Sequence, residues 1–237
     1  MEPRRRVSIF IPAYNEVHNL AEAIKEVVGV AEAVLDDYEV LLVDDGSTDG
    51  TRELADELTH EYPKLRVIHQ PRNLGIAAAY VRALDEAKLD HFSFLPADRE
   101  VSVDSIRAIF MAVGSADIVV PYHANARARA RHRRLMTWGY TALVNRVLGL
   151  SLHYYQGPTI YPTWLARELP KTAGGFSFPT EMLVHAVRAG HRYVEVGLHH
   201  RQRAHGTSKA VSVRNIGRAF ATVVRLWWGL RVRGGPR

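Results

Sequence analysis

Three turns that follow predicted strands carry acidic side chains. The acids are Glu16, Asp44, Asp45, Asp98 and Glu100. In a parallel sheet these turns share one edge, which is the edge where open α/β sheets bind ligands. Carboxylates gathered there can bind a divalent cation that bridges the oxygens of a diphosphate, with Arg or Lys neutralising the remaining charge. Because oxygen ligands favour Mg²⁺ or Mn²⁺ over Zn²⁺, the expected cofactor is magnesium or manganese.

Strand and helix patterns alternate through about the first half of the chain. Apolar runs predict strands at 7–11, 40–43, 65–69, 91–95 and 117–120, and apolar residues at helical spacing predict the helices between them. This spacing is typical of βαβ units, in which right-handed crossovers join parallel strands. We therefore expect an α/β fold, with helices flanking a mostly parallel sheet.

The stretch 38–51, YEVLLVDDGSTDGT, joins a buried strand to a carboxylate pair. Its continuous apolar run is typical of a parallel strand covered on both faces. Asp44 and Asp45 end the run, and Ser47 or Asp49 could cap the next helix. The two acids could accept hydrogen bonds from a ribose hydroxyl or a base N–H, or they could form a polar turn with a capping aspartate. The stretch alone leaves both interpretations open.

The second half of the chain is less regular and more basic. Residues 124–134 contain five arginines, most of which we expect on a solvated face. Helices are predicted at 135–148 and after the GGFSFP segment, where Glu181 falls in the first turn. A strand is predicted at 192–196. The histidines in the following segment, 199–209, lack the spacing of a metal site and are more typical of structural or surface positions.

The C-terminal segment 213–232 has an amphipathic helical pattern. Its apolar stripe comprises Val213, Ile216, Phe220, Val223, Trp227 and Leu230, and arginines lie on another face. Such a stripe could pack on the core. The Trp227–Trp228 pair and the flanking arginines equally suit a helix in a membrane interface. We expect one main α/β domain at 1–210 and an amphipathic helix with a basic tail at 211–237.

Composition limits the class of protein. The chain has 237 residues, 47% of them hydrophobic, a net charge of +6 and no cysteine. It can form a sizeable core, while a disulfide framework and a thiolate metal site are excluded. The first apolar run ends at Pro12, too short for a signal peptide, and no window reaches the roughly 18 apolar residues of a spanning helix. We expect a cytoplasmic protein, peripheral at the inner face of the membrane.

Five ordered motifs give a more specific indication. IPAYNE, VDDGSTDGT, NLG, PADRE and RAHGTSK resemble the motifs of family 2 inverting glycosyltransferases with the GT-A fold. They are most similar to the branch that contains dolichol- and polyprenyl-phosphate sugar synthases. The resemblance implies an enzyme that transfers a sugar from a nucleotide diphosphate sugar to a polyprenyl phosphate of the dolichyl or undecaprenyl type.

The resemblance also implies a donor site and a metal site. The nucleotide sugar would be held by Pro12, Ala13, Tyr14, Glu16, Asp44, Asp45 and Asp98. Asp98 would be the main ligand of Mg²⁺ or Mn²⁺, with Glu100 as its second partner. Pro96 stands where the family's metal motif has its first acid. The metal would therefore have fewer protein ligands here.

Basic residues and one further acid complete the expected catalytic set. Arg133 or Arg134 would contact phosphates, and Arg203 and Lys209 would lie over the diphosphate or the acceptor phosphate. A lipid phosphate is already anionic, so alignment and charge stabilisation would suffice for its attack. A hydroxyl acceptor would need a general base, for which Glu181 is the best candidate.

Other functions stay open on the sequence alone. The same fold could act on a soluble hydroxyl acceptor. The proline in the metal motif suggests a non-catalytic nucleotide-sugar binding protein. The net charge of +6 and the arginine run suggest a nucleic-acid binder, but that function would leave the five motifs unexplained, so we expect no nucleic-acid partner. The sugar, the nucleotide base and the oligomeric state are not fixed by motifs.

Overall fold

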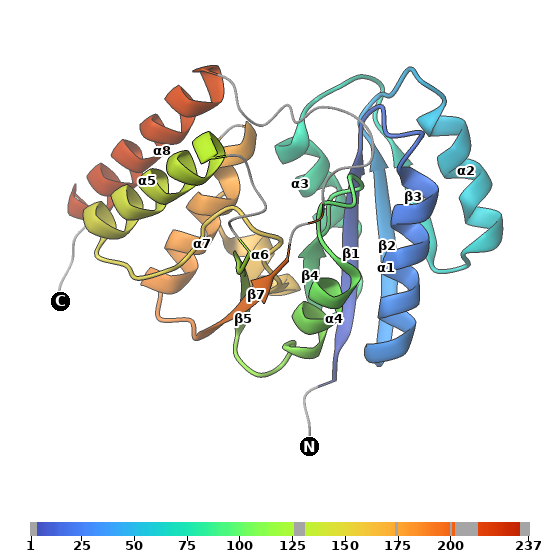
Figure 1. Cartoon of the computed structure of the whole chain (residues 1–237), viewed down its shortest axis with the longest axis horizontal. Helices are drawn as coiled ribbons and strands as arrows, with labels where there is room; N and C mark the ends of the chain where they lie inside the picture. The colour runs from blue at the N-terminus through green and yellow to red at the C-terminus, as the bar shows by residue number, and fades with distance from the viewer. Residues whose placement is uncertain (1–3, 126–130, 174, 200, 202–212, 233–237) are drawn as a thin grey trace.

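The computed structural model describes residues 4–125, 131–173, 175–199, 201 and 213–232 (Figure 1). The N-terminal half contains β1 (Arg6–Ala13), α1 (Leu20–Val34), β2 (Asp37–Asp44), α2 (Thr51–Glu61), β3 (Leu65–His69), α3 (Ile76–Glu86), β4 (His91–Phe94), α4 (Val103–Met111) and β5 (Ile118–His123). The C-terminal half contains α5 (Arg131–Leu148), β6 (Tyr161–Pro162), α6 (Thr163–Glu168), the short 3-10 helix η2 (Gly175–Ser177), α7 (Phe178–Arg188), β7 (Tyr193–Leu198) and α8 (Val213–Val232).

The main sheet has the strand order β3-β2-β1-β4-β6. The first four strands are parallel, and β6 pairs antiparallel with β4. The expected α/β fold with a mostly parallel sheet is confirmed. The fifth predicted strand differs in its placement, because β5 pairs with β7 in a separate parallel ribbon. A bridge between Val119 and Ile160 links this ribbon to the segment before β6.

Two hydrophobic clusters cover the faces of the main sheet. Successive side chains of a strand point to opposite faces, so neighbouring residues of β1 enter different clusters. Ile9 and Ile11 belong to the cluster that includes residues of α1 and α4, while Phe10 belongs to the cluster that includes residues of α3, α7 and α8. Burial on both faces explains why the strands read as continuous apolar runs rather than as alternating ones.

Strand register brings the acidic turns to one edge of the sheet. Ala13 at the end of β1 lies opposite Asp44 at the end of β2. On the other side of β1, Phe10 lies opposite Phe94 at the end of β4, and the Leu95 N–H donates to the Phe10 carbonyl at 2.9 Å. The three turns therefore follow three adjacent parallel strands, as the sequence predicted.

Several element boundaries differ from the predicted ones. Helix α5 begins at Arg131 rather than at 135, because arginine is a good helix former although it gives no apolar signal. The N-cap position of α2 is Gly50, so neither Ser47 nor Asp49 occupies it. The short elements β6 and α6 were not predicted.

Helix α8 presents two different faces. Val223 and Leu226 are buried in the same cluster as the main sheet, whereas Phe220, Val224 and Trp228 are exposed. The apolar stripe of the sequence is therefore divided between the two faces, with Val223 packed on the core and Phe220 exposed. Helix α8 packs beside α5 at the end of the molecule away from α2 (Figure 1). Within the described residues, no helix is long and apolar enough to cross a bilayer.

Candidate active site

The turns after β1 and β2 are joined by reciprocal hydrogen bonds. Asn15 has a positive φ of 56°, which asparagine tolerates better than most residues. Its N–H donates to Ser47 Oγ at 3.0 Å, and its Oδ1 accepts from the Thr48 N–H at 2.9 Å. The Glu16 N–H donates to Thr51 Oγ1 at 2.9 Å. These contacts fix the first two motifs relative to each other before any ligand binds.

Asp44 is completely buried and accepts hydrogen bonds on both carboxylate oxygens. The Ser47 N–H donates to Oδ1 at 2.9 Å, while Arg52 Nε and His69 Nδ1 lie 3.2 and 3.1 Å from Oδ2. Burial acts to raise the pKa of Asp44, but the hydrogen bonds from Ser47 and His69 and the charge of Arg52 lower it below its ordinary value. Asp44 is therefore an ionised anchor for this turn.

Asp45 organises the NLG motif. Its Oδ1 accepts from Gln70 Nε2 at 2.9 Å and from the Leu74 N–H at 2.7 Å, and its Oδ2 accepts from the Gly75 N–H at 2.9 Å. Gly75 has a φ of 89°, which favours glycine at this position. The side chain of Asp45 is only 5% exposed. Contacts of Asp44 or Asp45 with a ribose or a base stay a prediction.

Replacing Asp45 by Ala is expected to destabilise the fold by about 3 kcal/mol, because it leaves buried donors without an acceptor. Asp45→Asn should cost less, since its amide oxygen can still accept part of these bonds. Urea unfolding of both variants measures the difference. A loss below about 1 kcal/mol for Asp45→Ala would show that water satisfies these donors.

The remaining residues of the first motif differ in what they can offer a ligand. Pro12 and Tyr14 are half-buried. Ala13 is buried, and its carbonyl accepts from the Asp45 N–H at 2.8 Å, so its contribution to a site would be structural. Glu16 is half-buried, and its Oε2 accepts from Asn19 Nδ2 at 2.7 Å.

Asp98 and Glu100 lie in the turn that follows β4. Both are half-buried, and the Glu100 N–H donates to Asp98 Oδ1 at 3.1 Å. Arg99 between them has a positive φ of 58°. The described part of the chain holds no cluster of three or more His, Cys, Asp or Glu that could bind a metal. A pair of carboxylates nevertheless fits Mg²⁺ or Mn²⁺, since Mg²⁺ in nucleotide sites usually takes one or two carboxylates and completes its shell with phosphate oxygens and water.

Glu181, the candidate base, is buried in the first turn of α7 and is 3% exposed. Thr172 Oγ1 donates to its Oε1 at 2.6 Å and the Ala173 N–H donates to its Oε2 at 2.7 Å. Arg225 from α8 forms an ion pair with it at 2.9 Å. The carboxylate thus ties α8 to α7.

The basic candidates are only partly described. Arg133 and Arg134 lie in the first turn of α5, and the side chain of Arg134 is exposed. The side chain of Arg133 lies outside the described part of the structure. Arg203 and Lys209 lie outside the described residues.

Sequence reasoning missed two further residues at this edge. Asn15 could have been found, because an asparagine within a turn is a common choice for positive φ. Glu26 gave no signal, because a single acid on an amphipathic helix is ordinary. In the structure Glu26 forms ion pairs with both Arg99 and Arg201.

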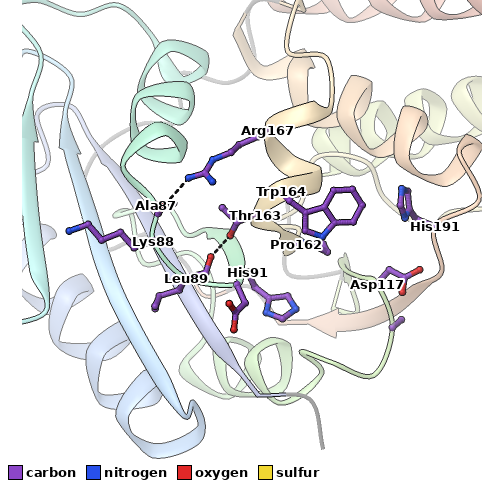
Figure 2. Close-up of a pocket in the computed structure, with 12 residues that line it drawn as sticks. Ala87, Lys88, Leu89, His91, Asp117, Pro162, Thr163, Trp164, Arg167 and His191 are labelled. Atoms are coloured by element: carbon purple, nitrogen blue, oxygen red, sulfur yellow. Dashed lines mark hydrogen bonds between the residues drawn. The ribbon is translucent and has the colours of Figure 1, made fainter.

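A pocket of about 650 Å³ lies at the opposite edge of the sheet (Figure 2). It is lined by residues around the start of β4 and of α6 and includes none of the predicted site residues. Arg167 donates to the Ala87 carbonyl at 2.7 Å, and Thr163 Oγ1 donates to the Leu89 carbonyl at 2.6 Å. These polar groups support the fold, so this pocket is not the candidate active site.

Comparison with solved structures defines the class of fold. Glucosyl-3-phosphoglycerate synthase from Mycobacterium tuberculosis, crystallised with uridine diphosphate, superposes with a TM-score of 0.71 at 20% identity, covering 94% of this chain and 80% of that one. The chain therefore shares the GT-A fold of that glycosyltransferase. The model of the family described as glycosyl transferase family 2 matches residues 8–163, and the chain belongs to that family.

Three curated relatives extend the comparison. Undecaprenyl-phosphate mannosyltransferase from Micrococcus luteus is 28% identical over 239 residues, covering 96% of both chains. Polyprenol monophosphomannose synthase from Mycolicibacterium smegmatis is 29% identical, covering 98% of this chain and 90% of that protein. Glycosyltransferase AglD from Haloferax volcanii is 28% identical, and the match covers 96% of this chain but 38% of that protein.

Proposed function

We propose that this glycosyltransferase transfers a sugar from a nucleoside diphosphate sugar to a polyprenyl phosphate, with inversion at the anomeric carbon. The names of two relatives that match along nearly their whole length support a polyprenyl phosphate acceptor. The structural observation that carries the proposal is the state of Glu181. Its carboxylate is buried and already accepts from Thr172, Ala173 and Arg225, so it is poorly placed to remove a proton from a hydroxyl.

The reaction would need little proton transfer. A phosphate oxygen of the acceptor attacks the anomeric carbon from the side opposite the leaving diphosphate, and the bond to that diphosphate breaks. Asp98 and Glu100 would hold Mg²⁺ or Mn²⁺, and the bound ion would supply charge stabilisation to the leaving diphosphate. Two structures of the M. tuberculosis synthase contain Mn²⁺ together with a uridine nucleotide, which supports this use of a divalent ion. Arg133, Arg134, Arg203 and Lys209 would neutralise phosphate charge.

The acceptor would be reached at a membrane surface through α5 and α8. The side chains exposed on these two helices include Leu135, Trp138, Phe220, Val224 and Trp228. The sequences of both helices contain arginines and no Asp or Glu. Apolar side chains combined with basic ones favour the interface of a membrane that carries anionic lipids. We therefore place the protein at the membrane periphery, with α5 and α8 facing the lipid.

The donor site is tested by titrating the protein with GDP, UDP and dTDP, each with and without Mn²⁺. We expect one nucleotide to bind more tightly than the others and Mn²⁺ to strengthen it. The corresponding sugar nucleotide is then assayed with a short-chain polyprenyl phosphate. Failure of every nucleotide to bind would overturn the proposal.

Glu181→Gln distinguishes a phosphate acceptor from a hydroxyl acceptor. If the acceptor is a phosphate, kcat is expected to fall by no more than about fivefold, whereas loss of a general base would cost on the order of 100- to 10,000-fold. Arg225→Leu is the matched control, because it breaks the same ion pair without changing the carboxylate. Equal losses in the two variants would assign the effect to the contact between α7 and α8 rather than to acid–base chemistry.

A further inference from the structure

Glu26 lies on α1 and contacts two arginines from distant parts of the chain. Arg99 Nη2 lies 2.6 Å from its Oε1, and Arg201 Nη2 lies 2.5 Å from its Oε2. The side chain of Glu26 is 15% exposed. Burial acts to raise the pKa of Glu26, but the hydrogen bonds from Arg201 and Arg99 lower it below its ordinary value. The carboxylate is therefore ionised at neutral pH and bridges two cations.

The first of these cations belongs to the turn with the candidate metal ligands. Arg99 lies between Asp98 and Glu100 and has a positive φ of 58°. A residue with a Cβ pays a conformational penalty in this region, so surrounding contacts must hold it there. Two hydrogen bonds from Arg99 to Glu26 Oε1, at 2.6 and 3.2 Å, provide such a contact.

The second cation belongs to the segment after β7. The Arg201 N–H donates to the Glu100 carbonyl at 2.8 Å, and Arg201 Nη2 donates to the Val101 carbonyl at 3.1 Å. The Ser102 N–H donates to the His199 carbonyl at 3.1 Å. After β7 the chain therefore runs along the turn that carries Asp98 and Glu100. Residues 202–212 follow Arg201 in the sequence.

We propose that Glu26 is a positioning residue that fixes the Asp98–Glu100 turn and the segment at Arg201 in one arrangement. This inference rests on the proposed function, because the turn matters only if it holds the metal and the diphosphate. Glu26 would act through Arg99 and Arg201 and would not touch the substrate. Removing its charge should release both segments while leaving the sheet and its core in place.

Glu26→Gln tests this role, with Glu22→Gln as the matched control. Glu22 lies one turn earlier on α1, is exposed, and forms an ion pair only with Lys25 within the described residues, at 3.9 Å. Its charge also acts on Arg99, but without a hydrogen bond, so the control separates the direct contacts of Glu26 from a general loss of negative charge on α1. Two quantities are measured in each variant. The first is hydrogen exchange at the amides of Arg201 and Ser102. The second is the dissociation constant of GDP or UDP with Mn²⁺, whichever nucleotide binds the wild type.

In Glu26→Gln we expect exchange at both amides to accelerate and the dissociation constant to rise about tenfold, a typical effect for a residue that orients metal ligands. Glu22→Gln should change neither quantity. A purely structural role would lower the melting temperature of Glu26→Gln but leave its nucleotide affinity within about twofold of the wild type at 20–25 °C, where both proteins are folded. That result would overturn the inference. Unchanged hydrogen exchange at the amides of Arg201 and Ser102 would also overturn it. Absence of nucleotide binding by the wild type would instead overturn the proposed function, and the inference with it.

Discussion

Asp98→Asn is expected to lower kcat/KM by on the order of 100- to 1000-fold and to abolish the strengthening of nucleotide binding by Mn²⁺. Asparagine has nearly the same shape but no charge, and a hard divalent cation depends on anionic oxygen. The loss should be large because Pro96 occupies the position of the first acid, which leaves few carboxylates in this turn. Titration with Mn²⁺ and steady-state kinetics measure the two effects.

Asp104→Asn is the control for this substitution. Asp104 is an exposed acid in the first turn of α4, on the same segment as Asp98. Asp104→Asn removes one carboxylate charge, as Asp98→Asn does, but at a residue that is not an expected metal ligand. If Asp98→Asn retained both Mn²⁺ dependence and activity, the metal would have to be held elsewhere or be dispensable.

Replacing Trp138 and Trp228 together by Ala is expected to weaken binding to vesicles containing anionic lipid by on the order of 100-fold. The two tryptophan residues are 70% and 63% exposed, one on α5 and one on α8. Burying an aromatic side chain of this size in a membrane interface contributes about 1.5 kcal/mol, so losing two of them costs about 3 kcal/mol, which is on the order of 100-fold in binding. Sedimentation with vesicles measures the partition.

Trp164→Ala serves as the control, because Trp164 is 54% exposed but lies on α6, outside the α5 and α8 face. Vesicle binding by that variant should equal that of the wild type. Binding should also fall as salt rises, since arginines contribute to it. If the double variant bound vesicles as tightly as the wild type, α5 and α8 would not be the membrane-facing surface.

The fold could be predicted to the extent that local patterns determine it. Strands β1 and β2 are buried on both faces, so each appears as an apolar run bounded by turn residues. The run at Ile118–His123 is of the same kind, and nothing within it shows that it pairs with β7, some 75 residues later, rather than with the main sheet. The two-residue strand β6 is too short to leave a periodic signal.

The candidate site was predictable in its location but less so in its internal contacts. Parallel strand order brings the acidic turns to one edge, and that inference needed only the strand pattern. The use of Asp45 to hold the Leu74 and Gly75 amides depends on a turn about 30 residues away. The ion pair of Glu26 with Arg201 spans 175 residues, so the folded arrangement alone reveals it.

The burial of Asp44 and Asp45 affects which residues could change if a related enzyme came to use a different nucleotide sugar. Because both carboxylates support the turns around them, we expect mutations at these positions to destabilise the fold as well as to change any contact with the nucleotide. Evolutionary change would instead proceed through exposed side chains of the same turns, such as Thr48, Asn73 and Leu74. The acidic pair would then keep the turns in place, while the exposed side chains around it could change with the substrate.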